Sequence, residues 1–187
     1  MAESNNVSNV SGTKGVKGGY IFAAPTGTTL PTDITTAKDG AFKCLGFISE
    51  DGYVETLDTD TEDLSDMNGD LMASIQTSRV ESAQFTLAEI KQGTLEFMYG
   101  KDNVTISDDG SIAVKHNGNA DDEYSLVLEL VLKNNRRWRK VVPIVKLTEL
   151  DDLTLAVGEL AARASTVKYL TDESGNTCYD YFDPVEA

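Results

Sequence analysis

The sequence has few of the side chains that enzymes use for catalysis. Its 187 residues include one histidine, His116, and two cysteines, Cys44 and Cys178. A zinc site needs three or four clustered ligands, and a nucleophile needs a base beside it. The glycine motifs that hold nucleotides and the Gly-x-Ser-x-Gly motif of hydrolases do not occur. We therefore expect no catalytic residue, no metal site and no cofactor.

Long apolar runs and an export signal are also missing. No run approaches the roughly 20 apolar residues that a membrane helix needs. The chain starts with Met-Ala-Glu-Ser-Asn-Asn, which has neither the basic nor the apolar region of a signal peptide. We expect a soluble protein made in the cytosol, in which both cysteines are buried free thiols. A disulfide or a reactive pair is the less favoured alternative.

Basic residues are scarce. The chain has 31 acidic and 16 basic residues, which gives a net charge of −15. Because each phosphate contact needs a lysine or an arginine, this balance disfavours binding to nucleic acid. Two interpretations stay open: the charge keeps the protein soluble, or it forms a surface past which DNA moves without adhering.

What the sequence does contain is a series of β patterns. Ala83, Phe85 and Leu87 alternate with polar residues, and an Asn-Asn turn joins the two long apolar runs 124–132 and 138–147. Further strands are predicted at 16–24, 41–48, 71–79, 81–87, 103–107, 111–115, 167–170 and 179–182. Pro143 indicates an edge or a bulge. One helix is predicted over 88–99, with Gly100 as its cap. The fold class is mainly β (α+β): a two-sheet β-sandwich or barrel flanked by one α-helix.

Acidic and basic residues are concentrated in separate segments. Residues 1–19 lack core-forming residues and indicate a flexible N-terminal arm, before one domain over 20–187. Residues 50–70 hold nine acidic residues and no basic one, which predicts a long exposed acidic loop, whereas 133–140 hold five basic residues and no acidic one. We predict that these segments meet between copies of the chain; the alternative is that they neutralise each other within one chain. The predicted contacts are Asp58, Asp60, Glu62 and Asp63 on one copy with Arg136, Arg137, Arg139 and Lys140 on another.

Other interpretations of these segments are weaker. Asp58 to Asp63 resembles the start of a calcium loop, but Asp63 and Gly69 stand where that loop needs glycine and glutamate. The basic segment surrounds Trp138, a pattern that also occurs in nucleic-acid contacts, or it is a solvated hairpin tip.

Four stretches in the same order resemble one protein family. Gly19 to Asp33 has a strand ending in Ala-Pro, followed by Gly-Thr-Thr-Leu-Pro, and Ala41 to Gly52 has Phe-Lys-Cys-Leu-Gly-Phe-Ile-Ser-Glu-Asp-Gly. Arg137 to Pro143 is an arginine-rich strand that ends in proline, and Leu150 to Leu160 contains Leu-Thr-Leu. These stretches resemble the major tail tube proteins of long-tailed, non-contractile bacteriophages. Phe47 replaces the usual tyrosine of that family.

The resemblance implies a structural subunit and no enzyme. It implies a β-sandwich or barrel that forms hexameric rings, stacked around a channel through which DNA passes without specific binding. The implied partners are other copies of the chain and the tail tape measure, tail terminator and baseplate proteins, with no membrane. The implied location is the virion tail, after assembly in the host cytoplasm. A β-sandwich adhesin or a virion surface or decoration protein is the alternative.

Overall fold

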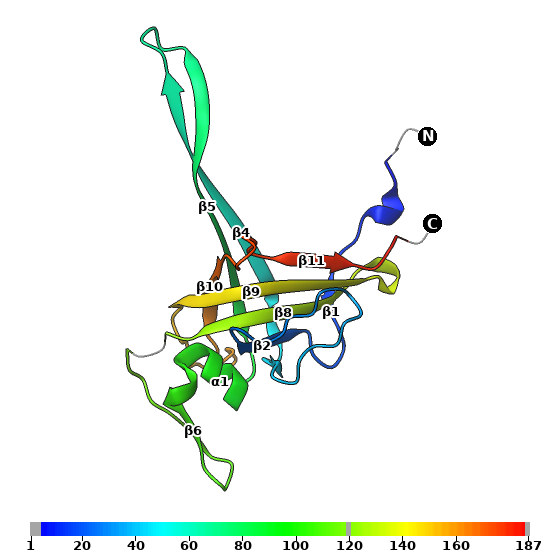
Figure 1. Ribbon diagram of the computed structural model, residues 1–187. Helices are drawn as coiled ribbons and strands as arrows, with labels where there is room; N and C mark the ends of the chain where they lie inside the picture. Colours follow the sequence, from blue (N-terminus) through cyan, green and yellow to red (C-terminus); the bar gives the residue numbers. More distant parts are fainter. Residues whose placement is uncertain (1–4, 119–120, 186–187) are drawn as a thin grey trace.

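One large antiparallel sheet organises the molecule (Figure 1). The computed structural model describes residues 5–118 and 121–185. The strand order is β3-β2-β8-β9-β10-β5-β4, with β1 added to β8 and β11 to β9, and β6 and β7 form a separate small sheet. The strands are β1 Lys14–Gly15, β2 Ile21–Pro25, β3 Lys43–Cys44, β4 Ile48–Ser65, β5 Leu71–Leu87, β6 Val104–Ile106, β7 Ile112–Val114, β8 Glu123–Val131, β9 Arg137–Leu150, β10 Ala164–Leu170 and β11 Tyr179–Phe182. The helices are α1 Gln92–Tyr99 and the short 3-10 turns Val7–Asn9, Lys101–Asn103 and Lys133–Asn135.

The predicted mainly-β fold with one helix is confirmed. Figure 1 shows β8 and β9 running across the direction of β4 and β5, so the twisted sheet folds over its own core, and it does not close into a barrel. The main core includes Phe85, Leu128 and Val142. Phe97 of α1 packs on Phe85, with ring centroids 6.0 Å apart, and covers one side of this core. A second, smaller cluster lies around Phe42 and Val141.

Strand β9 changes partners halfway along its length. Residues 138–141 pair with β11, whereas residues 144–150 pair with β10. Pro143 lies between the two regions, where the register with β8 also shifts. Proline has no N–H to donate, and its carbonyl accepts a 2.6 Å hydrogen bond from Ser125 Oγ. The predicted bulge at Pro143 is therefore confirmed.

The predicted acidic loop over 50–70 is wrong, because these residues form the first strand and the turn of a long β-hairpin. β4 and β5 pair from Tyr53–Phe85 to Ser65–Leu71. The loop prediction assumed that nine acidic residues cannot line a strand, which holds only for a strand with a buried face. This ribbon faces water on both sides beyond its base, so its carboxylates stay solvated while its threonines favour the extended backbone.

Several other elements begin or end at residues that differ from the prediction, and hydrogen bonds explain the difference at the helix. The helix starts at Gln92, not at 88, because Ala88 N–H bonds to Phe47 O and Lys91 is still extended. Gly100 caps it as predicted, with φ of 86° and its N–H on Glu96 O. The strand predicted at 16–24 is β2, at 21–25, the strand predicted at 41–48 shrinks to 43–44, and β10 starts three residues earlier than predicted. Within the described residues, no helix has the length and apolar character that crossing a membrane requires.

Candidate assembly interface

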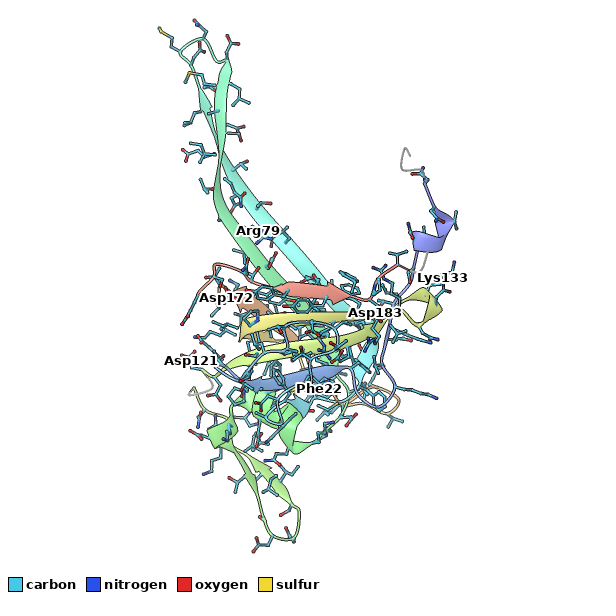
Figure 2. All side chains as sticks on the ribbon, turned by 45° about the vertical axis from the view of Figure 1, so that its right-hand side comes forward. Phe22, Arg79, Asp121, Lys133, Asp172 and Asp183 are labelled. Atoms are coloured by element: carbon cyan, nitrogen blue, oxygen red, sulfur yellow. The ribbon has the colours of Figure 1, made fainter. Side chains whose placement is uncertain are left out.

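The β4–β5 hairpin projects from the body of the protein (Figure 1). β10 pairs with β5 only from Ser82 onward, so residues 71–81 of β5 pair with β4 alone. Eleven residues separate Leu71 from Ser82, which at roughly 3.3 Å per residue places the tip about 35 Å beyond the sheet. In Figure 2 the labelled Arg79 lies on this projecting stem, above the body.

The four acidic residues predicted to contact another copy do not share one face of this hairpin. Side chains alternate along β4, which continues without an extra residue from Tyr53 to Leu64. Asp58, Asp60 and Glu62 therefore lie on one face and Asp63 on the other. On β5, Thr77 is the unpaired residue of a bulge, since Asp60 pairs with Ser78 and Thr61 with Gln76. Such a bulge increases the twist of the ribbon.

Hydrogen bonds close the turn at the end of the hairpin. The Asp66 carboxylate accepts the N–H groups of Asn68 and Asp70 at 2.8 Å each, and Asp66 N–H bonds to Asp70 O at 2.8 Å. These bonds, led by the one from Asp70, hold the pKa of Asp66 below its usual range. Gly69 has φ of 88°, which a residue with a Cβ adopts only with strain.

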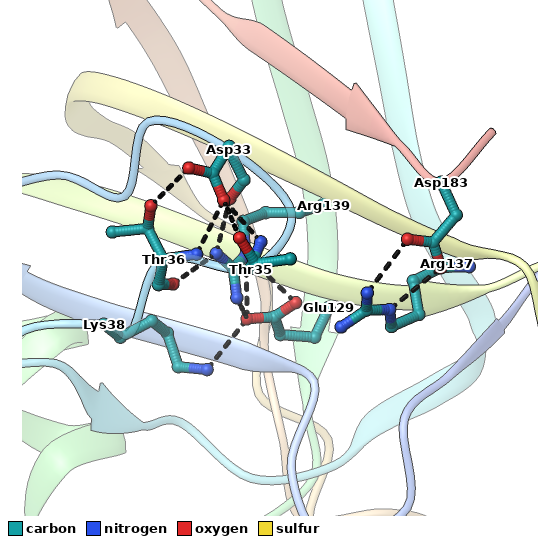
Figure 3. A network of polar contacts seen from close by, with 8 residues as sticks. All are labelled: Asp33, Thr35, Thr36, Lys38, Glu129, Arg137, Arg139 and Asp183. Carbon is teal, nitrogen blue, oxygen red and sulfur yellow. Dashed lines mark hydrogen bonds and ion pairs between the residues drawn. The ribbon is translucent and has the colours of Figure 1, made fainter.

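Arg139, predicted as an inter-subunit base, is buried within the chain (Figure 3). Its Nη2 lies 2.8 Å from Glu129 Oε1, and its Nη1 donates to the carbonyls of Asp33 and Thr36 at 2.7 and 2.6 Å. Glu129 is also 2.8 Å from Lys38 Nζ. Arg139 therefore fastens the segment between β2 and β3 to the sheet.

The Asp33 carboxylate organises the turn that Arg139 holds. It accepts the N–H groups of Thr35 and Thr36 and their hydroxyls, at 2.5 to 2.7 Å. These bonds, led by the Thr35 hydroxyl, place the pKa of Asp33 far below its usual range. The turn thus presents two carbonyls to the guanidinium in a fixed arrangement.

Lys140 is buried on the opposite face of β9. Its Nζ lies 2.9 Å from Glu55 and 3.3 Å from Asp180, beside Cys178 Sγ at 3.5 Å. Burial lowers the pKa of Lys140, but the hydrogen bond to Glu55 and the nearby acidic groups outweigh burial, so its pKa is raised. Glu55, one of the nine acidic residues, is thus neutralised within the chain.

Arg136 and Arg137 are nearer the surface. Arg137 makes a bidentate pair with Asp183 at 2.8 and 2.9 Å and is half exposed. Arg136 donates from Nε to Asp183 O at 2.7 Å, beside the Phe182 ring. All four predicted bases therefore have intramolecular partners. Arg139 and Lys140 point inward because β9 is a central strand with both faces covered, which the basic pattern alone does not reveal.

Comparison with known proteins supplies the family. A family model described as phage tail tube protein matches residues 2–183, nearly the whole chain. The chain belongs to the phage tail tube protein family. Members are structural proteins of the virion tail, so this tail tube protein is not an enzyme. A solved structure, the cryo-EM structure of the anti-feeding prophage cap (AFP tube terminating cap), is similar over 91% of this chain and 93% of that chain, with 10% identity and a TM-score of 0.43. No curated protein matches.

The segments that carry the family resemblance have structural roles in this tail tube protein. Gly46 has φ of 96°, and a Cβ there would lie 2.4 Å from Glu89. Glu89 in turn accepts the N–H of Phe47 at 3.0 Å. Gly52, with φ of 78°, lies in the irregular stretch where β4 enters its long pairing with β5. The motif thus sets how the chain enters the projecting hairpin.

The remaining candidate residues of the tail tube protein are its histidine and its two cysteines. His116 is exposed and its ring lies 4.6 Å from the Tyr99 ring. Cys44 and Cys178 are free thiols, as predicted, but each is only partly buried, whereas the sequence predicted buried thiols. Burial raises the pKa of the Cys178 thiol to about 11. In the part of the chain that the structure describes, no three His, Cys, Asp or Glu side chains gather as a metal site would require.

Proposed function

We propose that this tail tube protein polymerises into hexameric rings that stack into a tube, and that DNA passes through the central channel during ejection. The observation that carries the proposal is the long strand edge on a single copy whose backbone N–H and C=O groups have no partner strand. β4 is an 18-residue strand that pairs only with β5 in the described residues, so its other edge offers free N–H and C=O groups along most of its length.

Open edges of this length favour assembly. Proteins that remain single protect such edges with short strands, prolines or covering segments, because an open edge pairs with other chains. β4 has none of these protections beyond its charge. Closing copies into a ring pairs edges without leaving any open, and a closed ring is the usual symmetry of repeated identical contacts.

The acidic balance suits a channel that DNA must cross. Each copy has a net charge of −15, and lumen-facing carboxylates would repel phosphate over about 10 Å at 0.1 M salt. DNA would then pass without specific binding. The proposal includes the tail tape measure, tail terminator and baseplate proteins as partners, and assembly in the host cytoplasm before the tube is part of the virion.

We retain the contact of Asp58, Asp60, Glu62 and Asp63 with another copy as part of the proposal. Their hairpin carries them away from their own body, and among these four only Asp60 bonds to a neighbour, Ser78 Oγ on the adjacent strand. Of the predicted partners, Arg136 and Arg137 stay near the surface, whereas Arg139 and Lys140 are themselves buried and pair within their own chain.

Electron microscopy of the purified protein tests the proposal. We expect rings or tubes with six-fold symmetry at high concentration. Single particles that stay monomeric over a range of concentration and salt would refute it and would favour the alternative of an adhesin or decoration protein.

A further inference from the structure

We propose that the tip of the β4–β5 hairpin docks beside the β8–β9 turn of another copy, in the grooves between that turn and the N-terminal arm. The hairpin tip is residues 62–73. The arm–turn groove is formed by the described arm, the turn at 132–136 and the C-terminal segment 183–185. This inference rests on the proposed function, since it names the surface that receives the hairpin when copies assemble.

The hairpin tip combines apolar side chains with acidic charge. Met67 is 98% exposed, Met72 is 67% exposed and Leu71 is 62% exposed. The tip carries four acidic residues and no basic one. Methionine is flexible and polarizable, which suits it to fill an irregular groove. A partner surface must therefore offer both an apolar wall and positive charge.

The tip is already ordered for binding. The Asp66 carboxylate closes the turn through the N–H groups of Asn68 and Asp70. Docking such a turn orders less chain than docking a flexible loop does, and that reduces the entropy lost on binding.

The arm–turn groove offers both properties. A cavity of about 340 Å³ lies on one side of the turn, between Ser11, Lys133 and Val185, and one of about 520 Å³ lies on the other, between Val10 and Lys14. Val10 is 70% exposed and Val185 57% exposed, so each cavity has an uncovered apolar side chain within a mostly polar lining. Ser11 Oγ accepts Lys133 N–H at 2.6 Å, which holds the arm against the turn.

The groove is also positively charged. Within residues 5–118 and 121–185, neither Lys14 nor Lys133 forms an ion pair, and Arg136 bonds through Nε to a carbonyl. The acidic residue of the groove, Asp183, is neutralised by the bidentate pair with Arg137. Figure 2 shows Lys133 and Asp183 at the end of the body where the arm begins.

A second apolar surface is also exposed, but its negative charge excludes it as the docking site of the tip. The segment between β9 and β10 exposes Leu155 at 74% and Val157 fully. That segment, residues 151–163, holds three acidic residues and one basic one, Arg163, however, so its net charge is negative. An acidic tip would be repelled there, because like charges across an interface select against a partner. Of these two surfaces, only the arm–turn groove has the complementary charge.

The contact joins two different surfaces, so it repeats from copy to copy. In Figures 1 and 2 the tip lies far from the arm and the β8–β9 turn of its own chain. A contact between unlike surfaces leaves one tip and one groove free at the ends of any open series, and so it propagates.

Cross-linking of isotope-mixed assemblies tests this docking. Equal amounts of ¹⁴N- and ¹⁵N-labelled protein are assembled and treated with a carbodiimide, which joins carboxylates to lysine amines in direct contact. We expect mixed-isotope peptides that join Asp63 or Asp70 to Lys133 or Lys14. Tubes whose tip is joined to other lysines would overturn the inference and leave the proposed function standing. Protein that never assembles would overturn both.

Charge and apolar variants give a second readout, the critical concentration for assembly. We expect Met67→Ser with Met72→Ser to raise it about tenfold or more, because the variant no longer buries two large apolar side chains on assembly. Lys14→Glu with Lys133→Glu raises it as well, and Asp63→Lys with Asp70→Lys in the same chain lowers it again.

Asp108→Lys is the matched control, since Asp108 is an exposed acid on the turn between β6 and β7 and undergoes the same charge change. Equal effects of Asp108→Lys and Asp70→Lys would show that net charge alone acts, and would overturn the docking site.

Discussion

Replacing Arg139 by methionine removes the charge that Glu129 faces inside the protein. The Glu129 side chain is only 14% exposed, and the Asp33 and Thr36 carbonyls also lose their donor. Removing one partner of a buried ion pair costs about 3–5 kcal/mol. Lys38 still pairs with Glu129, so we expect the lower end, about 3 kcal/mol. In a domain of this size that lowers Tm by roughly 6–12 °C.

The assay is thermal unfolding of the unassembled subunit, followed by circular dichroism at low concentration. The matched control is Arg137→Met. Its pair with Asp183 is half exposed, and such surface pairs contribute about 0–1 kcal/mol, so its Tm should fall by no more than about 4 °C. The double variant Arg139→Met with Glu129→Met should recover part of the loss, because Glu129 is then no longer a buried charge without Arg139, and only Lys38, whose side chain is 23% exposed, loses its ion pair.

The result distinguishes an intramolecular role of Arg139 from a role in contacts between copies. If Arg139 served only to contact another copy, its replacement would leave the Tm of the subunit unchanged and abolish assembly. A Tm shift below about 2 °C for Arg139→Met would refute the intramolecular role described above.

Three further predictions concern the hairpin, the arm and pH. Changing Asp58, Asp60, Glu62 and Asp63 to lysine should block polymerisation while the thermal unfolding of the subunit stays nearly unchanged; normal tubes would show that these acids are only solvated. Deleting residues 1–19 removes β1 and one wall of the arm–turn groove, so the domain should still fold, as seen by circular dichroism, but polymerise poorly in a sedimentation assay. The pKa of Asp33 is lowered by its hydrogen bonds to Thr35 and Thr36, so its stabilisation is present above about pH 4, the ordinary aspartate value, and is lost as the pH falls toward the folded pKa. The urea midpoint should therefore fall below pH 4, and less steeply for Asp33→Asn; identical pH profiles for the two proteins would contradict this.

The sequence predicts the parts of this fold whose signals are local. The β8–β9 hairpin follows from two apolar runs around Asn134 and Asn135, which both have φ near 60°. The β6–β7 hairpin follows in the same way from the turn at Asp108 to Gly110. Each of these elements is set by residues that are neighbours in the chain, so pattern and turn chemistry suffice to find them.

The parts that the sequence did not predict depend on distant partners. Lys140 is buried because Glu55, 85 residues away, meets it, and Arg139 because the turn at Asp33 covers it. A run of basic residues gives no sign of which ones enter a central strand. The first strand of the acidic hairpin was missed for a related reason: beyond its base β4 has no buried face, so neither alternation nor apolar content identifies it, whereas β5 was predicted as two strands.

The ion pairs of Lys140 lie at the base of the projecting hairpin, so they fix the direction in which the hairpin points. Glu55 opposes Ala83 about 11 residues below the tip, a length of roughly 35 Å. A rotation of about 5° at Glu55 would displace the tip by about 3 Å, which is the length of one hydrogen bond. Lys140 holds Glu55 on one side and Asp180 on the other, and thereby ties the stem to β9 and β11. The direction of the hairpin is thus set where the stem leaves the body, far from the tip that we propose docks on another copy.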